Sequence, residues 1–203
     1  LAAVYQHFVG EERNVALVMA GLPSNVAQLI SDESVSFLRR ARQCHLGRVA
    51  DGDIEIAFKR TVADGGATID DDALAEAVQA IEGYPYMLQL VGYWTWEQAD
   101  SSAIARPDVE RGIRLAVQEL REGVLAATYR ELSKGDIRFL EAMLDDAGSS
   151  SLSDISARMG VKSNYASKYK ERLLTSGILR ELGGGFYTVD LPGFKDFVRE
   201  RRG

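Results

Sequence analysis

Residues 163–180 carry polar and basic side chains of the kinds that bind nucleic acid. Asparagine can pair with adenine edges, serine with bases or phosphates, and lysine with phosphates. On a helix, Ala166, Tyr169 and Leu173 fall on one face and should pack inward, which leaves the opposite face for such contacts. The residues that we expect to contact DNA are Ser163, Asn164, Tyr165, Ser167, Lys168, Lys170 and Arg180.

A winged helix-turn-helix over residues 132–202 would position these side chains. Ser133, with Asp136 three residues later, predicts a capped first helix. Two further helices are each ended by a glycine, as helices commonly are. Their expected ranges are 153–159 and 163–176, with Ser163 as the cap of the second.

The end of this segment predicts a β-hairpin. Residues 178–182 and 186–189 alternate like two strands around Gly183, Gly184 and Gly185. A hairpin beside a three-helix unit is typical of the winged helix, whose third helix can enter a DNA major groove.

Charge supports this interpretation only in part. Residues 1–130 hold 12 basic and 19 acidic side chains, whereas residues 131–203 hold 12 basic and 11 acidic ones. The second segment is therefore much less acidic, but it is not strongly basic. Electrostatics alone would support weak, salt-sensitive DNA binding.

Several classes of protein are disfavoured by the composition. The single cysteine, Cys44, excludes an internal disulfide framework and fits a reducing cytoplasm. With His7 and His45 it leaves no spacing typical of zinc. The longest apolar run, Val15–Leu22, is too short to span a bilayer, so we expect a cytoplasmic protein with no membrane partner. The chain opens with Leu1 in a helical pattern, and we expect it to be part of a larger protein.

The remaining pattern predicts a mainly α fold with a small α/β portion. The apolar run 15–20 favours a strand buried on both faces, as in a parallel sheet covered by helices, and residues 44–49 could form another strand. A short helix over residues 25–30 and a basic one over 34–42 complete this portion.

Short helices follow from residue 51 onward. Asp51 and the acids at 70–72 are expected to cap two of them, and Gly83 to end the second. Pro85 then opens an apolar helix that should be central to its domain. Residues 105–129 predict one long helix.

Four sequence segments resemble a known family. They are VMAGLP, FLRRAR, IEGYPYMLQLVGYWTW and LLTSGILRELGGGFYTVDLPGFKDFV. Together they resemble the C-terminal part of a prokaryotic AAA+ or STAND-type P-loop ATPase of the archaeal ATPase kind, over essentially the whole chain. The resemblance implies a remnant of the α/β nucleotide-binding core (1–49), a helical lid (50–105), a linker helix (106–130) and a winged helix (131–203).

The resemblance also implies which part of the larger protein would bind nucleotide. A missing N-terminal core would supply the phosphate-binding loop, because no GxxxxGK[ST] occurs here. The parent would bind ATP or ADP with Mg²⁺ and could oligomerise, whereas this chain alone should hold no cofactor and be inactive.

Candidate residues follow from the same resemblance. Ser24 or Asn25 would be the polar sensor after the first strand, with a plain turn as the alternative. Arg40, flanked by Arg39 and Arg42, would contact phosphate, or else the three form a solvated basic face. Gly83, Tyr84 and Pro85 would contact the bound nucleotide. The alternative is that these residues only end one helix and begin the next. Relatives often carry basic residues at the tip of the wing, where this chain has three glycines.

Two other functions stay open. The first is a plain winged-helix transcriptional regulator with an N-terminal sensing or dimerisation domain. The second is a protein-interaction module without DNA binding. An enzyme with its own active site is least supported, because no Ser/His/Asp, Cys/His or paired-carboxylate group stands out. A sheet edge exposed by truncation would invite dimerisation.

Overall fold

The computed structural model describes residues 2–19, 21, 26, 29–31, 33–42, 44 and 47–202. The chain divides into two compact units, neither of which is continuous in sequence. The helical unit comprises Leu46–Gly148 and Leu191–Gly203, and the hairpin unit comprises Leu1–His45 and Ser149–Asp190. These divisions do not follow the linear boundaries expected at residues 49, 105 and 130.

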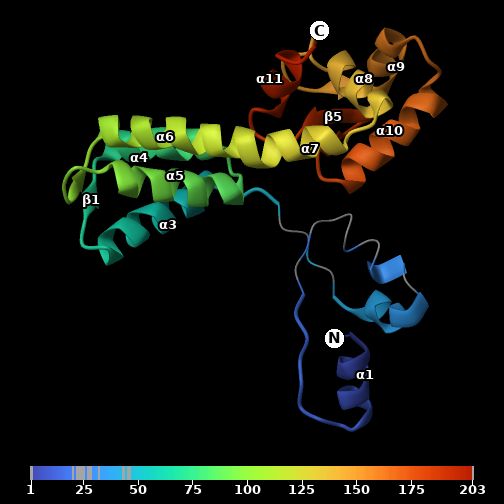
Figure 1. Ribbon diagram of the computed structural model, residues 1–203, viewed down its shortest axis with the longest axis horizontal. Helices are drawn as coiled ribbons and strands as arrows, with labels where there is room; N and C mark the ends of the chain where they lie inside the picture. The colour runs from blue at the N-terminus through green and yellow to red at the C-terminus, as the bar shows by residue number, and fades with distance from the viewer. Residues whose placement is uncertain are drawn as a thin grey trace. The chain divides into compact units, whose positions relative to one another are not determined.

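Four helices form the main body of the helical unit, and Figure 1 shows them side by side. Each buries apolar residues three or four positions apart, as amphipathic helices do, for example Ile54, Phe58 and Val62 on the first. The helices are α3 (Asp51–Asp64), α4 (Asp71–Ile81), α5 (Pro85–Gln98) and α6 (Arg106–Leu120). A two-residue parallel pair, β1 (Thr68–Ile69) with β2 (Ala103–Ile104), joins the connections between them.

The contact between α5 and α6 is close because Gly112 has no side chain. A Cβ at Gly112 would lie 2.6 Å from both the backbone nitrogen and the Oγ1 of Thr95. The buried face of α5 carries Met87, Leu90 and Val91, but Tyr93 and Trp96 are about half exposed. The apolar helix that was expected to be central to its domain packs against α4 and α6, but one of its faces is exposed.

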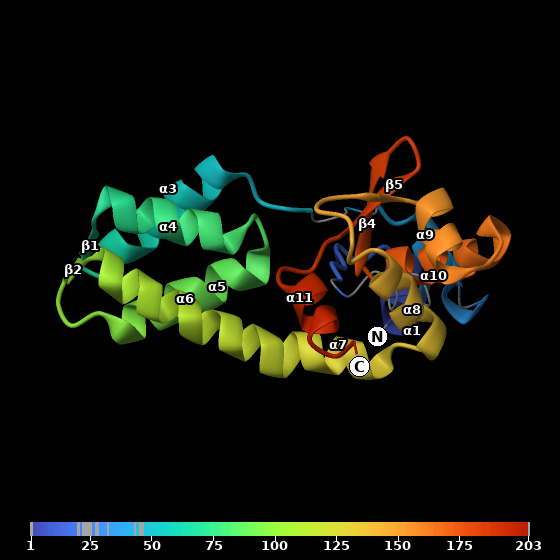
Figure 2. The ribbon, with the colours of Figure 1, turned by 90° about the horizontal axis from the view of Figure 1, so that it is seen from above.

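The long helix predicted over residues 105–129 is confirmed, with one irregularity. Helix α6 continues through a π-helical turn, η2 (Arg121–Leu125), into α7 (Ala126–Glu131), and Figure 2 shows the run without a break. Helix α8 (Lys134–Ala142) follows. The sequence did not predict α11 (Phe194–Arg199), which packs against both α8 and η2.

An aromatic and cationic cluster holds α11 in place. Phe197 is 2% exposed, and two guanidinium groups contact its ring: that of Arg201 lies 3.5 Å from the ring centroid and that of Arg121 lies 5.5 Å away. Tyr129 from α7 meets the same ring edge-on at 5.9 Å. Arg121 also pairs with Glu200. Cation–π contacts of this kind add to the stability that apolar burial provides.

The hairpin unit contains two helices and a small sheet in its C-terminal portion. Helix α9 (Leu152–Met159) is followed by a turn at Gly160 and by α10 (Ser163–Thr175). Strands β4 (Leu179–Gly183) and β5 (Phe186–Val189) form the predicted hairpin, and β3 (Ser150–Ser151) pairs with the other edge of β5. Its N-terminal portion contains α1 (Ala2–Gly10) and η1 (Glu33–Arg40).

Two helix caps follow the serine–aspartate pattern. Ser133 and Asp136 form a reciprocal capping box at α8, as predicted. The Ser151 hydroxyl accepts from the Asp154 amide at 3.1 Å and so caps α9. Two predicted caps are wrong, because Asp51 and Ser163 are the first residues inside their helices. Asp70 is the N-cap residue of α4 but makes no side-chain cap bond, whereas Asp72 in the first turn accepts from the Ala73 amide at 2.9 Å.

The two strands expected in the first 49 residues do not form among the residues of this segment that the structure describes. Residues 13–19 have no regular structure, and Val18 is 93% exposed. Residues 44 and 47–50 are likewise irregular. A doubly buried strand needs neighbouring strands and helices over both faces, and the described residues of this segment supply neither. The fold is mainly α, as expected, and no strand forms among the described residues of 1–49.

Candidate nucleic-acid interface

Helix α10 presents the polar face that its sequence predicts. Ala166 and Leu173 are buried, and the Tyr169 side chain is half-buried on the same side. Asn164 and Lys168 are exposed on the other side. Ser167 lies between them with intermediate exposure. The face therefore offers an amide, a hydroxyl and a cation to solvent from one rigid element.

Lys170 is turned away from that face. Its Nζ lies 2.8 Å from a Glu171 carboxylate oxygen and 5.5 Å from the centre of the Tyr187 ring. The hydrogen bond with Glu171 raises the pKa of Lys170, although burial opposes the shift. This lysine was predicted to contact DNA, but its charge is already satisfied inside the unit.

Arg180 on β4 is also paired. Its Nε donates to Asp190 Oδ1 at 2.8 Å, across the base of the hairpin. The guanidinium group is about half exposed. It can still reach a phosphate, but only in competition with Asp190.

Two tyrosines form the border of the polar face. Tyr169 donates its hydroxyl hydrogen to the Tyr165 hydroxyl at 2.8 Å, and the rings meet edge-on at 5.4 Å. The guanidinium of Arg172 lies 5.4 Å from the Tyr169 ring. Tyr165 is thereby fixed in orientation while 49% of it stays exposed. Ser163, at the first turn, lies 3.1 Å from the buried Ser156 hydroxyl, which ties α10 to α9.

The tip of the hairpin is apolar, which the sequence interpretation did not anticipate. Leu182 is 50% exposed and Phe186 is 47% exposed, on either side of the three glycines. Gly183, Gly184 and Gly185 all have positive φ, between 62° and 90°, which favours glycine at each position. Successive side chains of a strand point to opposite faces, and Tyr187 is the buried residue of β5. This alternation could have predicted that the neighbouring Phe186 is exposed.

The glycine–proline element of the helical unit has a structural role. Gly83 is buried with φ of 74°, and its carbonyl accepts from the Val49 amide at 2.8 Å. A Cβ at Gly83 would lie 2.8 Å from the Val49 carbonyl oxygen. Arg48 donates to the Glu82 carbonyl. Tyr84 precedes α5 as its N-cap residue and Pro85 opens it. The chain's own segment 48–49 therefore occupies the space beside Gly83.

The remaining predicted residues lie in the N-terminal segment. Ser24 and Asn25 lie outside the described residues. Arg39 donates to the backbone carbonyls of Ile30 and Ser31 at 3.0 and 3.3 Å, so it stabilises its own segment. Arg40 and Arg42 are exposed. These arginines belong to the hairpin unit, whereas Gly83, Tyr84 and Pro85 belong to the helical unit.

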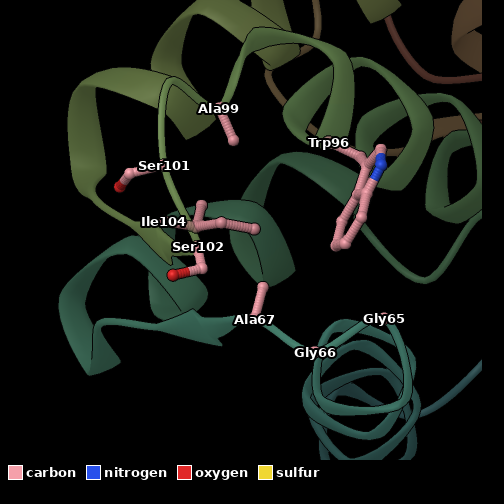
Figure 3. A pocket seen from close by; sticks show the side chains of 8 residues that line it. All are labelled: Gly65, Gly66, Ala67, Trp96, Ala99, Ser101, Ser102 and Ile104. Atoms are coloured by element: carbon pink, nitrogen blue, oxygen red, sulfur yellow. The ribbon is translucent and has the colours of Figure 1, made fainter.

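Two hollows lie in the helical unit. Figure 3 shows the smaller one, of about 290 Å³, in which the Trp96 ring reaches over the loop at Gly65 and Gly66. The larger one, of about 440 Å³, lies between α3 and α5 and is mostly apolar. Trp96 lines both, whereas Gly83, Tyr84 and Pro85 line neither. In the described part of the chain no three metal-binding side chains come together.

Comparisons with known proteins identify similar chains without assigning a function. Residues 122–198 match a family described as a domain of unknown function, DUF8462. Curated proteins give no match. None of the helices that the structure describes has the length and hydrophobicity to cross a bilayer.

Similar solved structures include those of RuvB from Thermotoga maritima, described as a Holliday junction branch migration motor. One has 18% sequence identity and a TM-score of 0.35, covering 75% of this chain and 50% of that one. Two mutant forms give TM-scores of 0.37 and 0.36 at the same identity and coverage. The chain thus spans half the length of RuvB, and a likeness at this level carries no argument about its site.

Proposed function

We propose that α8, α9, α10 and the β4–β5 hairpin act as a winged helix-turn-helix that contacts DNA through α10. The observation that carries the proposal is the exposed face of α10, where Asn164, Ser167 and Lys168 are presented together. Side chains of these types bind base edges and phosphates, and a helix fits the major groove.

Local charge favours the same conclusion. Residues 149–190 carry six basic and four acidic side chains. Two of the acids, Glu171 and Asp190, are held by Lys170 and Arg180, and Asp154 takes part in the cap of α9. These ion pairs also neutralise Lys170 and Arg180, so the region keeps a net charge of +2, to which the exposed Lys168 contributes. Tyr165 and Ser163 would flank the contact and Arg180 would reach it from the hairpin.

We further propose that the whole chain is the C-terminal portion of a nucleotide-binding ATPase. In this proposal residues 1–49 belong to its core, 50–105 form the lid, 106–130 the linker helix and 131–203 the winged helix. The missing core would bind ATP or ADP with Mg²⁺, and nucleotide would meet the lid near Gly83, Tyr84 and Pro85. Arg40 and Asn25 remain candidates for the phosphate-contacting and sensor residues. This chain alone should not hydrolyse ATP, and measured hydrolysis would contradict that statement.

The deciding experiment measures binding of the chain to a 20-base-pair duplex by fluorescence anisotropy at 50 and 200 mM salt. We expect affinity to fall steeply with salt, because phosphate contacts release counterions. Lys168→Glu should weaken binding by about tenfold or more, since it replaces attraction to phosphate by repulsion. Lys134→Glu, on the exposed start of α8, makes the same change in net charge and should have a much smaller effect.

Two results would contradict the proposal. Absence of binding at low salt would favour a protein-interaction module. Equal losses for Lys168→Glu and Lys134→Glu would show that net charge, rather than the α10 face, drives the association.

A further inference from the structure

We infer that the hairpin tip is an apolar wedge that stacks on unpaired bases, so that the preferred ligand of this surface is a duplex with an interrupted base stack. The inference rests on the proposed DNA contact through α10. It assigns the tip a role that differs from phosphate binding.

The first observation is where apolar side chains are left exposed. Among the large hydrophobic residues of 149–190, the exposed ones are Tyr165, Leu182 and Phe186, each 47–50% accessible. Two of the three flank the glycine turn at the hairpin tip. The tip has no basic side chain, so it offers a phosphate little, whereas an aromatic ring offers every base a stacking partner.

The second observation is that Phe186 is held on a rigid backbone. It pairs with Ser151 on one side and with Gly183 on the other, in the central strand of the sheet. The next residue, Tyr187, is buried against Lys170. The backbone that carries the exposed ring is thus fixed before any ligand arrives, which lowers the entropy cost of binding.

The third observation is the shape of the tip. The register between β4 and β5 shifts between Glu181 and Gly183, which leaves Leu182 as a bulged residue, and bulges redirect side chains. A Cβ at Gly183 or Gly185 would meet nothing within 4 Å. A Cβ at Gly184 would lie 3.8 Å from Cδ2 of the Phe186 ring, so the three glycines leave bare backbone between two apolar side chains. Leucine and phenylalanine are among the residues that enter base steps as wedges.

Charge decides between nucleic acid and an apolar protein surface as the occupant. Helix α10 packs against β4 within the same unit, and it presents Lys168. Residues 149–190 carry six basic and four acidic side chains, a net charge of +2, and the ion pairs of Glu171 and Asp190 neutralise Lys170 and Arg180 at the same time. An anionic ligand with flat apolar faces satisfies both features, and a nucleic acid with an unpaired base is such a ligand.

The test compares two 20-base-pair duplexes that differ only by one unpaired 2-aminopurine in the centre. We expect the full chain to bind the bulged duplex about tenfold more tightly than the paired one. This ratio corresponds to the free energy gained when one base stacks on an aromatic side chain. The 2-aminopurine fluorescence should fall on binding as the base stacks. Phe186→Ala should remove both effects and leave affinity for the paired duplex unchanged, whereas Phe186→Tyr should retain them.

A matched control and the contrary outcomes complete the design. Tyr93→Ala removes an aromatic side chain that is 55% exposed on α5, and it should change neither affinity. Equal binding of both duplexes, with loss of both on Lys168→Glu, would overturn the wedge and leave the α10 proposal intact. No binding to either duplex would overturn both. A Phe186→Ala variant that still prefers the bulged duplex would overturn the wedge alone.

Discussion

The two units of this protein differ in their charge and in how much of their apolar surface they bury. The helical unit carries 14 basic and 22 acidic residues, and its helices bury their apolar faces against one another. Residues 149–190 of the hairpin unit carry six basic and four acidic ones and leave a polar helix face and an apolar tip exposed. The first region thus uses its apolar residues for internal packing, whereas the second leaves exposed the side chains that we propose contact DNA.

Two phenylalanines give the sharpest contrast between these regions. Phe197→Ala should lower the free energy of unfolding of the helical unit by about 4 kcal/mol, because it removes a ring 2% exposed between two guanidinium groups. Both tryptophans of the chain, Trp94 and Trp96, lie on α5, so their fluorescence during urea unfolding reports on this unit. Phe186→Ala, at the exposed tip, should change the stability by less than about 0.5 kcal/mol. A comparable loss from Phe186→Ala would contradict the division into a packed region and a contact region.

The close approach of α5 and α6 should be the next most sensitive feature. Gly112→Ala would place a Cβ 2.6 Å from the Thr95 backbone nitrogen, and we expect a loss of about 2 kcal/mol through overpacking. The same substitution at Gly52 on α3 meets nothing within 4 Å. It should instead stabilise by up to about 1 kcal/mol, because alanine favours helix. Urea midpoints followed by tryptophan fluorescence distinguish the two results, and equal shifts would disprove the packing explanation.

The smallest expected effect comes from the two serine caps, one in each unit. Ser133→Ala and Ser151→Ala should each cost about 1 kcal/mol, because each removes a cap of a helix amide. We expect the loss at Ser133 to appear in the tryptophan transition. The loss at Ser151 should appear only in helix content measured by circular dichroism. If both variants shift both signals equally, the two units unfold as one cooperative body.

Features with a local chemical signal could be predicted from the sequence. The α8 capping box, the extent of α10, its inward and outward faces and the glycine-centred hairpin all follow from residues within a few positions of one another. Such signals depend on backbone hydrogen bonding and side-chain periodicity, which do not require knowledge of the rest of the fold.

Features that depend on distant partners could not be predicted. The apolar run at 15–19 looks like a buried strand, yet Val18 is exposed because no described neighbour covers it. The Lys170 ammonium group contacts Tyr187, which lies 17 positions away in the sequence, as well as the adjacent Glu171. Helix α11 is held by Arg121 and Tyr129, far upstream in the chain. Sequence patterns identify which residues can make contacts, but tertiary neighbours decide which of them do.

The π-helical turn η2 lets the long helix hold one residue more than a regular α-helix of the same number of turns. A π turn closes hydrogen bonds between residues five apart, whereas an α turn closes them between residues four apart, so the extra residue is accommodated within the wider turn. Deleting one residue between Arg121 and Leu125 should therefore leave α6 and α7 continuous as a regular helix, with the same face of α7 toward α11. A single-residue change in the length of the chain is absorbed at this point without disturbing the packing on either side of it.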